Sequence, residues 1–147
     1  MVDINQQVTY WREGAREDWE VACELVDRGR ALHGLFFAHL ALEKILKAHV
    51  CRCTGDLAPR LHNLVRLAET AGLRLNSVQL DVLADMNAFN IEGRYPGSLL
   101  PRPSELEERG YMTRAEEVFR WLIYQLWRGF ESICAASVRT GSTSASA

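Results

Sequence analysis

The chain has 147 residues, of which 48% are hydrophobic and 24% charged, a balance typical of one globular domain. Its formal net charge is −2, so no global electrostatic attraction draws it to nucleic acid or to an anionic membrane. No run of eighteen apolar residues predicts a membrane-spanning helix, and the N-terminus lacks the basic and apolar stretches of a signal peptide. Four cysteines are too few for a disulfide framework in a chain of this length. We therefore expect a cytoplasmic protein with reduced thiols and no membrane partner.

The first half of the chain predicts two long helices. Apolar residues spaced three and four apart predict a helix over 6–27, which Arg28-Gly29-Arg30 ends. A second helix is predicted over 31–53. Its apolar residues cover most of its circumference, which is typical of a central helix. The few polar residues on this helix are therefore the informative ones.

Shorter segments follow. A helix is predicted over 61–71, and another runs from the capping box of Asn76 and Gln79 to near Gly93. The stretch 96–108 contains three prolines and is predicted to be a loop.

The last helix is predicted to start at a second capping box, Thr113 with Glu116, and to reach about Val138. No stretch alternates with period two, so no strand is expected. The predicted fold class is all-α, an up-and-down antiparallel helical bundle of four to five helices with a long Pro-containing loop before the last helix. We expect a helical domain over 1–139 and a disordered tail over 140–147, which contains only Ser, Ala, Gly and Thr.

The central helix carries one polar stripe. His39, Glu43 and Lys47 are spaced four residues apart and share a narrow face, with Lys44 beside them. One interpretation is a stripe that reaches solvent and is supported by pairing within the helix. The other is a semi-buried charged groove that receives a ligand or a partner chain, with Arg94 within reach of Glu43 and Lys47.

Two further positions carry polar chemistry. His62 is expected in the first turn of the short helix, where it could cap the helix or pack against a neighbour; the sequence identifies no partner for it as a catalytic base. Arg94 follows Gly93 at a helix end, where it could cap carbonyls or present its guanidinium to a phosphate. The series His49-x-Cys51-x-Cys53 does not predict a metal site, because residues two apart on a helix point about 200° apart.

Three segments together resemble the HEPN family, in the prokaryotic type encoded beside small nucleotidyltransferases. The stretch 37–48, FAHLALEKILKA, is similar to the family's central-helix motif. Pro59-Arg60-Leu61-His62-Asn63-Leu64 resembles its Pro-x-x-His-Asp/Asn-Leu segment, and Arg94-Tyr95-Pro96 resembles its Arg-Tyr-Pro signature. The resemblance covers about residues 7–138 and implies a helical bundle that is commonly a homodimer.

The resemblance implies two functions. The first is a non-enzymatic module that dimerises and binds a nucleotide or a nucleotidyltransferase partner. We expect neither a cofactor nor a metal. The candidate ligand-binding residues are Glu43, Lys44, Lys47, His62, Arg94 and Tyr95.

The second is a toxin-like ribonuclease that acts on RNA and that a nucleotidyltransferase partner holds in check, as in toxin–antitoxin pairs. Its family signature is an Arg followed four to six residues later by a His. At the matching positions this chain has Phe89 and Arg94, and Arg28 with His33 fits the spacing only across a Gly turn. Because the sequence departs from that signature, we assign no catalytic residue and expect no RNA cleavage.

Overall fold

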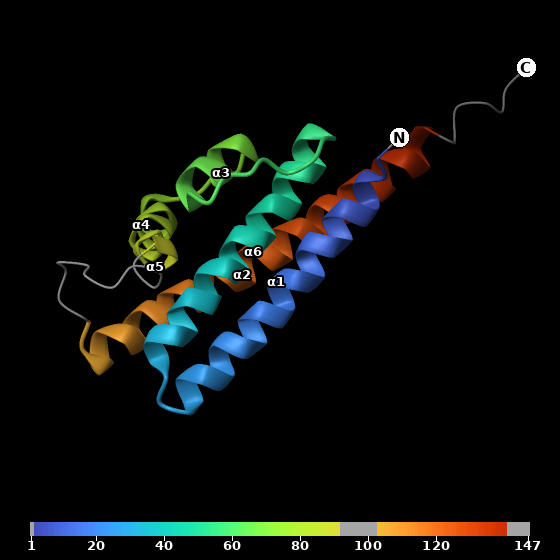
Figure 1. Cartoon of the computed structure of the whole chain (residues 1–147). Coiled ribbons are helices and arrows are strands. Elements are labelled where there is room, and N and C mark those ends of the chain that lie inside the picture. Colours follow the sequence, from blue (N-terminus) through green and yellow to red (C-terminus); the bar gives the residue numbers. More distant parts are fainter. Residues whose placement is uncertain (1, 92–102, 141–147) are drawn as a thin grey trace, which may run out of the picture.

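The computed structural model describes residues 2–91 and 103–140, with side chains through 90 and over 103–128. Its helices are α1 (Ile4–Asp27), α2 (Ala31–Thr54), α3 (Leu64–Thr70), α4 (Ser77–Met86), the single turn α5 (Ala88–Ile91) and α6 (Glu105–Thr140). The described residues contain no strand. The predicted all-α helical bundle is confirmed (Figure 1).

Helices α1 and α2 form an antiparallel pair joined by a tight turn. Gly29 takes a positive φ of 76°, a conformation that glycine adopts at little cost, and this turn ends α1 as the sequence predicted. Gly34 lets the helices approach closely, because a Cβ added there would lie 2.7 Å from Val26 Cγ2. The long helix α6 lies alongside this pair, whereas α3, α4 and α5 pack on the side of α2 away from α1 (Figure 1).

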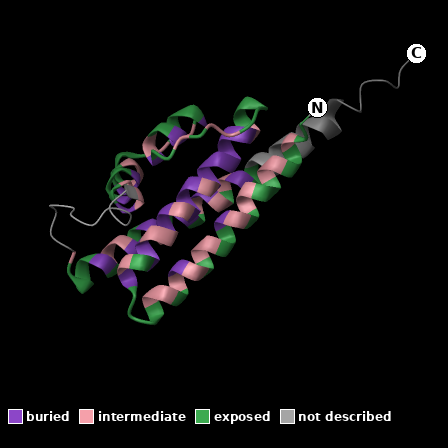
Figure 2. Cartoon of the chain, in the orientation of Figure 1, coloured by how far each residue is buried: buried purple, intermediate pink, exposed green. Residues whose placement is uncertain are grey.

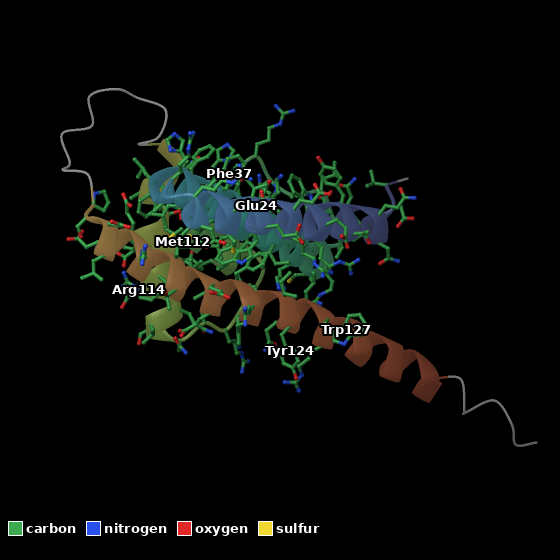
Figure 3. The ribbon with its side chains drawn as sticks, turned by 90° about the horizontal axis from the view of Figure 1, so that it is seen from below. Glu24, Phe37, Met112, Arg114, Tyr124 and Trp127 are labelled. Carbon is green, nitrogen blue, oxygen red and sulfur yellow. The ribbon has the colours of Figure 1, made fainter. Side chains whose placement is uncertain are left out.

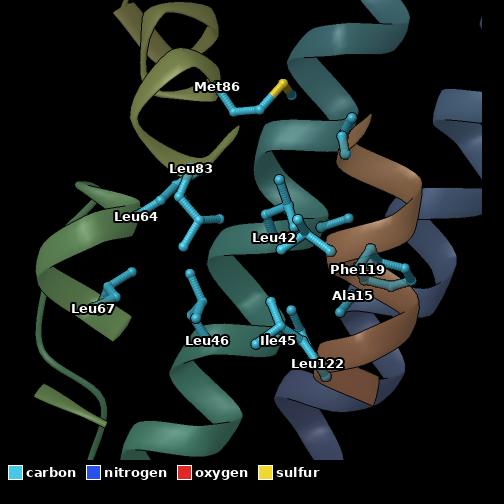
Figure 4. Packing of buried hydrophobic residues seen from close by; sticks show 14 of the residues in the cluster. Ala15, Leu42, Ile45, Leu46, Leu64, Leu67, Leu83, Met86, Phe119 and Leu122 are labelled. Carbon is cyan, nitrogen blue, oxygen red and sulfur yellow. The ribbon is translucent and has the colours of Figure 1, made fainter. Parts of the chain in front are cut away.

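Helix α2 is the centre of the core, as its all-round apolar character predicted. Buried residues concentrate on it, while α1 alternates between partly buried and exposed faces (Figure 2). Leu46 faces Leu67 of α3 on one side of α2, and Ile45 meets Leu122 of α6 on the other (Figure 4). Helix α2 is therefore packed between α3 on one side and α6 on the other (Figure 4).

The middle helices differ from the predicted boundaries. Helix α3 begins at Leu64 because Asn63 is extended and its side chain accepts a hydrogen bond from Arg66 N, 3.1 Å away. His62 therefore precedes the helix, and the prediction that placed it in the first turn was wrong. The predicted fourth helix is divided at Asn87, whose side chain accepts a hydrogen bond from Leu64 N at the start of α3. Its predicted capping box is confirmed: Gln79 N lies 2.8 Å from Asn76 Oδ1.

The start of the last helix was predicted wrongly. Helix α6 begins at Glu105, so residues 105–108 are helical rather than loop. Ser104 Oγ accepts a hydrogen bond from Glu107 N at 3.2 Å, which caps the helix, and acidic residues fill its first turn. Thr113 lies inside the helix, where its hydroxyl donates to the carbonyl of Arg109.

Candidate functional site

Glu43 connects two cationic or titratable side chains from different parts of the chain. Its Oε2 lies 3.2 Å from Lys47 Nζ, one helical turn further along α2. Its Oε1 lies 2.8 Å from Nδ1 of His62, in the segment before α3. The carboxylate therefore connects the segment before α3 to the central helix. Two motifs that are separate in the sequence thus form one cluster of Glu43, Lys47 and His62.

The cluster is buried except at its outer end. The side chains of Glu43 and Lys47 are each 7% exposed, whereas that of His62 is 62% exposed. The pairing expected within the helix is present, but the interpretation of a stripe that reaches solvent was wrong. Trp11 of α1 packs against Lys47, and His62 packs against Glu43, contacts that local spacing could not reveal.

His39 lies fully buried one turn before Glu43 on the same helix. Neither ring nitrogen forms a hydrogen bond with a described residue. Burial lowers the pKa of His39 to about 4, while the carboxylate of Glu43 opposes that shift. His39 is therefore neutral near pH 7 and adds no charge to the cluster.

Both candidate lysines reach α1, but to different partners. The ammonium of Lys47 lies 5.1 Å from the ring centroid of Trp11, a cation–π contact. Lys44 Nζ lies 2.7 Å from Asp18 Oδ2, and its stem packs against Gly14. The structure thus brings Glu43, Lys47 and His62 together and places Lys44 in a separate ion pair.

Two asparagines fix the segment that carries His62. Asn87 Oδ1 accepts a hydrogen bond from Leu64 N at 2.8 Å, and Asn87 Nδ2 lies 3.4 Å from Asn63 Oδ1. Each asparagine thus holds the start of α3 against the junction of α4 and α5. Sequence reasoning missed Asn87, because a partner 23 residues away leaves no local signal.

Exposed cations flank His62 in the sequence. Arg60 and Arg66 are both exposed, and neither forms an ion pair with a described residue. Arg94 and Tyr95 lie outside the described residues, and so does the expected approach of Arg94 to Glu43. Phe89, which stands where the family's nucleases carry their Arg, is buried with its ring 5.3 Å from that of Tyr111.

The buried His49 and the partly buried Arg52 serve packing between helices. Nε2 of the buried His49 lies 2.8 Å from the carbonyl oxygen of Leu122, and Arg52 donates to the Leu126 carbonyl, so both bind α6 to α2. The cysteines whose side chains are described are free. No group of acidic, His or Cys side chains among the described residues could hold a metal ion. Within the same residues, no helix has both the length and the apolarity to cross a membrane.

Comparisons with known proteins agree with this architecture. Two solved structures share the fold. One is TT1696 from Thermus thermophilus, with a TM-score of 0.68 and 19% identity, covering 82% of this chain and 98% of that one. The other is ST0689, an archaeal HEPN homologue, with a TM-score of 0.63 and 18% identity, covering 81% of this chain and 97% of that one. A search of curated proteins finds no match.

The sequence itself identifies the family. Residues 8–126 match the model of the HEPN domain, a span that includes the three motifs noted above and the buried cluster. At this coverage the match is decisive, and the chain belongs to the HEPN domain family.

Proposed function

We propose that this chain is a non-enzymatic HEPN module that dimerises and binds a nucleotide, or a nucleotidyltransferase partner, at the surface around His62. The observation that supports this proposal is an exposed imidazole fixed from behind by a buried carboxylate. A side chain held in one orientation loses little entropy when it binds a ligand. The buried Glu43 and Lys47 would act by orienting His62 rather than by touching the ligand.

A nucleotide is favoured over the protein partner by the charges near His62. Arg60 and Arg66 are exposed and unpaired among the described residues, and guanidinium groups bind phosphate oxygens in a bidentate manner. Lys44 and Lys47 already have acidic partners, so they are poorer phosphate ligands. Arg94 and Tyr95 stay sequence-based candidates for the same ligand.

Calorimetry with purified protein and ATP tests the proposal. His62→Ala should weaken binding, and Arg60→Ala with Arg66→Ala should also reduce its salt dependence, because fewer phosphate contacts form. His33→Ala, which removes an exposed histidine at the start of α2, is the matched control. Absence of nucleotide binding, together with a His62-dependent complex with a nucleotidyltransferase, would replace the nucleotide with the protein partner.

A ribonuclease is the second candidate, because a histidine held by a carboxylate can serve as a general base. RNA cleavage also requires an acid for the leaving oxygen, and the buried His39 is neutral near pH 7. Purified protein is therefore expected to leave labelled single-stranded RNA and transfer RNA intact. Cleavage that survives Phe89→Ala but disappears in His62→Ala would establish the ribonuclease instead.

A further inference from the structure

The hydrogen bond between His62 and Glu43 determines which ring nitrogen carries a proton. Nδ1 of His62 lies 2.8 Å from Oε1 of Glu43. An ionised carboxylate can only accept hydrogen bonds, so the hydrogen must be on Nδ1. Nε2 lies across the ring, in a side chain that is 62% exposed, and has no hydrogen-bond partner among the described residues.

The charge of Glu43 is already balanced within the cluster. Its second oxygen faces Lys47 at 3.2 Å, with both side chains 7% exposed, and the neighbouring His39 is neutral. In a neutral imidazole ring, a hydrogen on Nδ1 leaves the lone pair on Nε2.

An outward lone pair selects ligand groups that donate hydrogen bonds. An ionised phosphate has no hydrogen to give, whereas the ribose hydroxyls and the exocyclic amine of a base do. A nucleotide could therefore bring its phosphates to Arg60 or Arg66 and its nucleoside to His62.

We infer that His62 presents an unprotonated Nε2 that accepts a hydrogen bond from a hydroxyl or amine of the nucleoside. The site would then distinguish nucleotides by the hydrogen-bond donors of the nucleoside rather than by charge. This inference rests on the proposed nucleotide binding. It makes Glu43 a positioning residue, since it sets the tautomer of His62 without contacting the ligand.

Binding of ATP analogues tests whether Nε2 of His62 accepts a hydrogen bond from the nucleoside. A single lost hydrogen bond should weaken binding about three- to tenfold. Weaker binding of dATP or 3′-deoxy-ATP than of ATP identifies a ribose hydroxyl as the donor, and weaker binding of ITP identifies the base amine. In His62→Ala the discrimination should vanish, whereas His33→Ala should retain it. Equal affinities for all four nucleotides, or discrimination that persists in His62→Ala, would overturn the inference.

Which ring nitrogen of His62 carries the hydrogen can be tested without any ligand. Nitrogen-15 NMR at pH 8 should show His62 with a protonated Nδ1 and an unprotonated Nε2, and Glu43→Ala should yield a mixture of tautomers. A protonated Nε2 in the wild-type protein would overturn the inference even where nucleotides bind. If no nucleotide binds, both the proposed nucleotide binding and the proposed hydrogen bond to the nucleoside fail. The NMR spectrum then decides the tautomer of His62 by itself.

Discussion

At the scale of single residues, most of the buried polar side chains among the described residues lie on α2. As whole residues, His39, Glu43 and Lys47 are at most 5% exposed. The other buried residues of this helix, apart from His49, are apolar or glycine. Burying such groups is costly unless their partners are in place. Lys47 supplies the opposite charge beside the buried carboxylate of Glu43, so its loss should affect both stability and the site.

Lys47→Met should lower the free energy of unfolding by about 3–5 kcal/mol, because it leaves the buried carboxylate of Glu43 without its cation. The control is Arg120→Met, which removes a similarly spaced pair with Glu116 on the surface of α6 and should cost no more than about 1 kcal/mol. Urea denaturation followed by circular dichroism measures both. Similar losses in the two variants would show that burial adds nothing to the Glu43–Lys47 pair.

Acid should destabilise the fold through its buried histidines. Burial lowers the pKa of both His39 and His49 to about 4, whereas the unfolded imidazole keeps its ordinary value of 6.5. The unfolded state therefore binds more protons between these values, so stability is complete above pH 6.5 and falls as the pH falls toward 4. The loss is of order 3 kcal/mol for each histidine. His49→Gln should flatten the dependence of the urea midpoint on pH; an unchanged slope would contradict the assignment.

At the scale of elements, the effect of a helical glycine on stability depends on what packs against it. Gly34 lies where α2 meets α1, and an added Cβ would be 2.7 Å from Val26 Cγ2 and 2.9 Å from the carbonyl oxygen of Ala22. Gly110 lies within α6 with open space around it. Both glycines are helical, so the same substitution compares packing with intrinsic helix preference.

Gly34→Ala should therefore destabilise the protein by about 1–3 kcal/mol, since the clash with the α1 backbone outweighs the gain in helix propensity. Gly110→Ala should stabilise it by about 1 kcal/mol, because alanine is the better helix former and meets no neighbour. Thermal unfolding of the two variants provides the measurement. A rise in the midpoint for Gly34→Ala would show that α1 and α2 are not in close contact at this point.

At the scale of the whole molecule, the bundle exposes aromatic rings on its long helices. Of the four tryptophans, Trp11, Trp19 and Trp121 are partly buried, whereas Trp127 is 59% exposed. Tyr124 is 55% exposed one turn earlier on α6 (Figure 3). Large exposed aromatic residues are enriched where proteins associate, so this part of α6 is our candidate for the proposed homodimer contact.

Sedimentation equilibrium at micromolar concentration should give a dimer for the wild-type protein, and Trp127→Ala should shift the equilibrium toward monomer because it removes aromatic contact area. Val78→Ala, which truncates an exposed apolar residue of α4, is the control and should leave the association unchanged. A wild-type protein that sediments only as a monomer would contradict the dimer, and equal behaviour of both variants would place the interface elsewhere.

The sequence by itself determined the family, the helical class and the helix ends that depend on neighbouring residues. The capping of α4 by Asn76 and Gln79 is such a feature, because both partners lie within one turn. Local pattern could not choose between Ser104 and Thr113, since both precede a glutamate by three residues and only the actual start of α6 distinguishes them.

Only the tertiary structure decided what the polar residues do. The sequence identified Glu43, Lys47 and His62 as candidate site residues. It left open whether the polar stripe on α2 faces solvent or a ligand. The contact between Glu43 and His62 joins residues 19 apart, and that between Asn87 and Leu64 joins residues 23 apart. Such contacts, and the burial that makes them strong, arise only when helices pack, so no local periodicity encodes them.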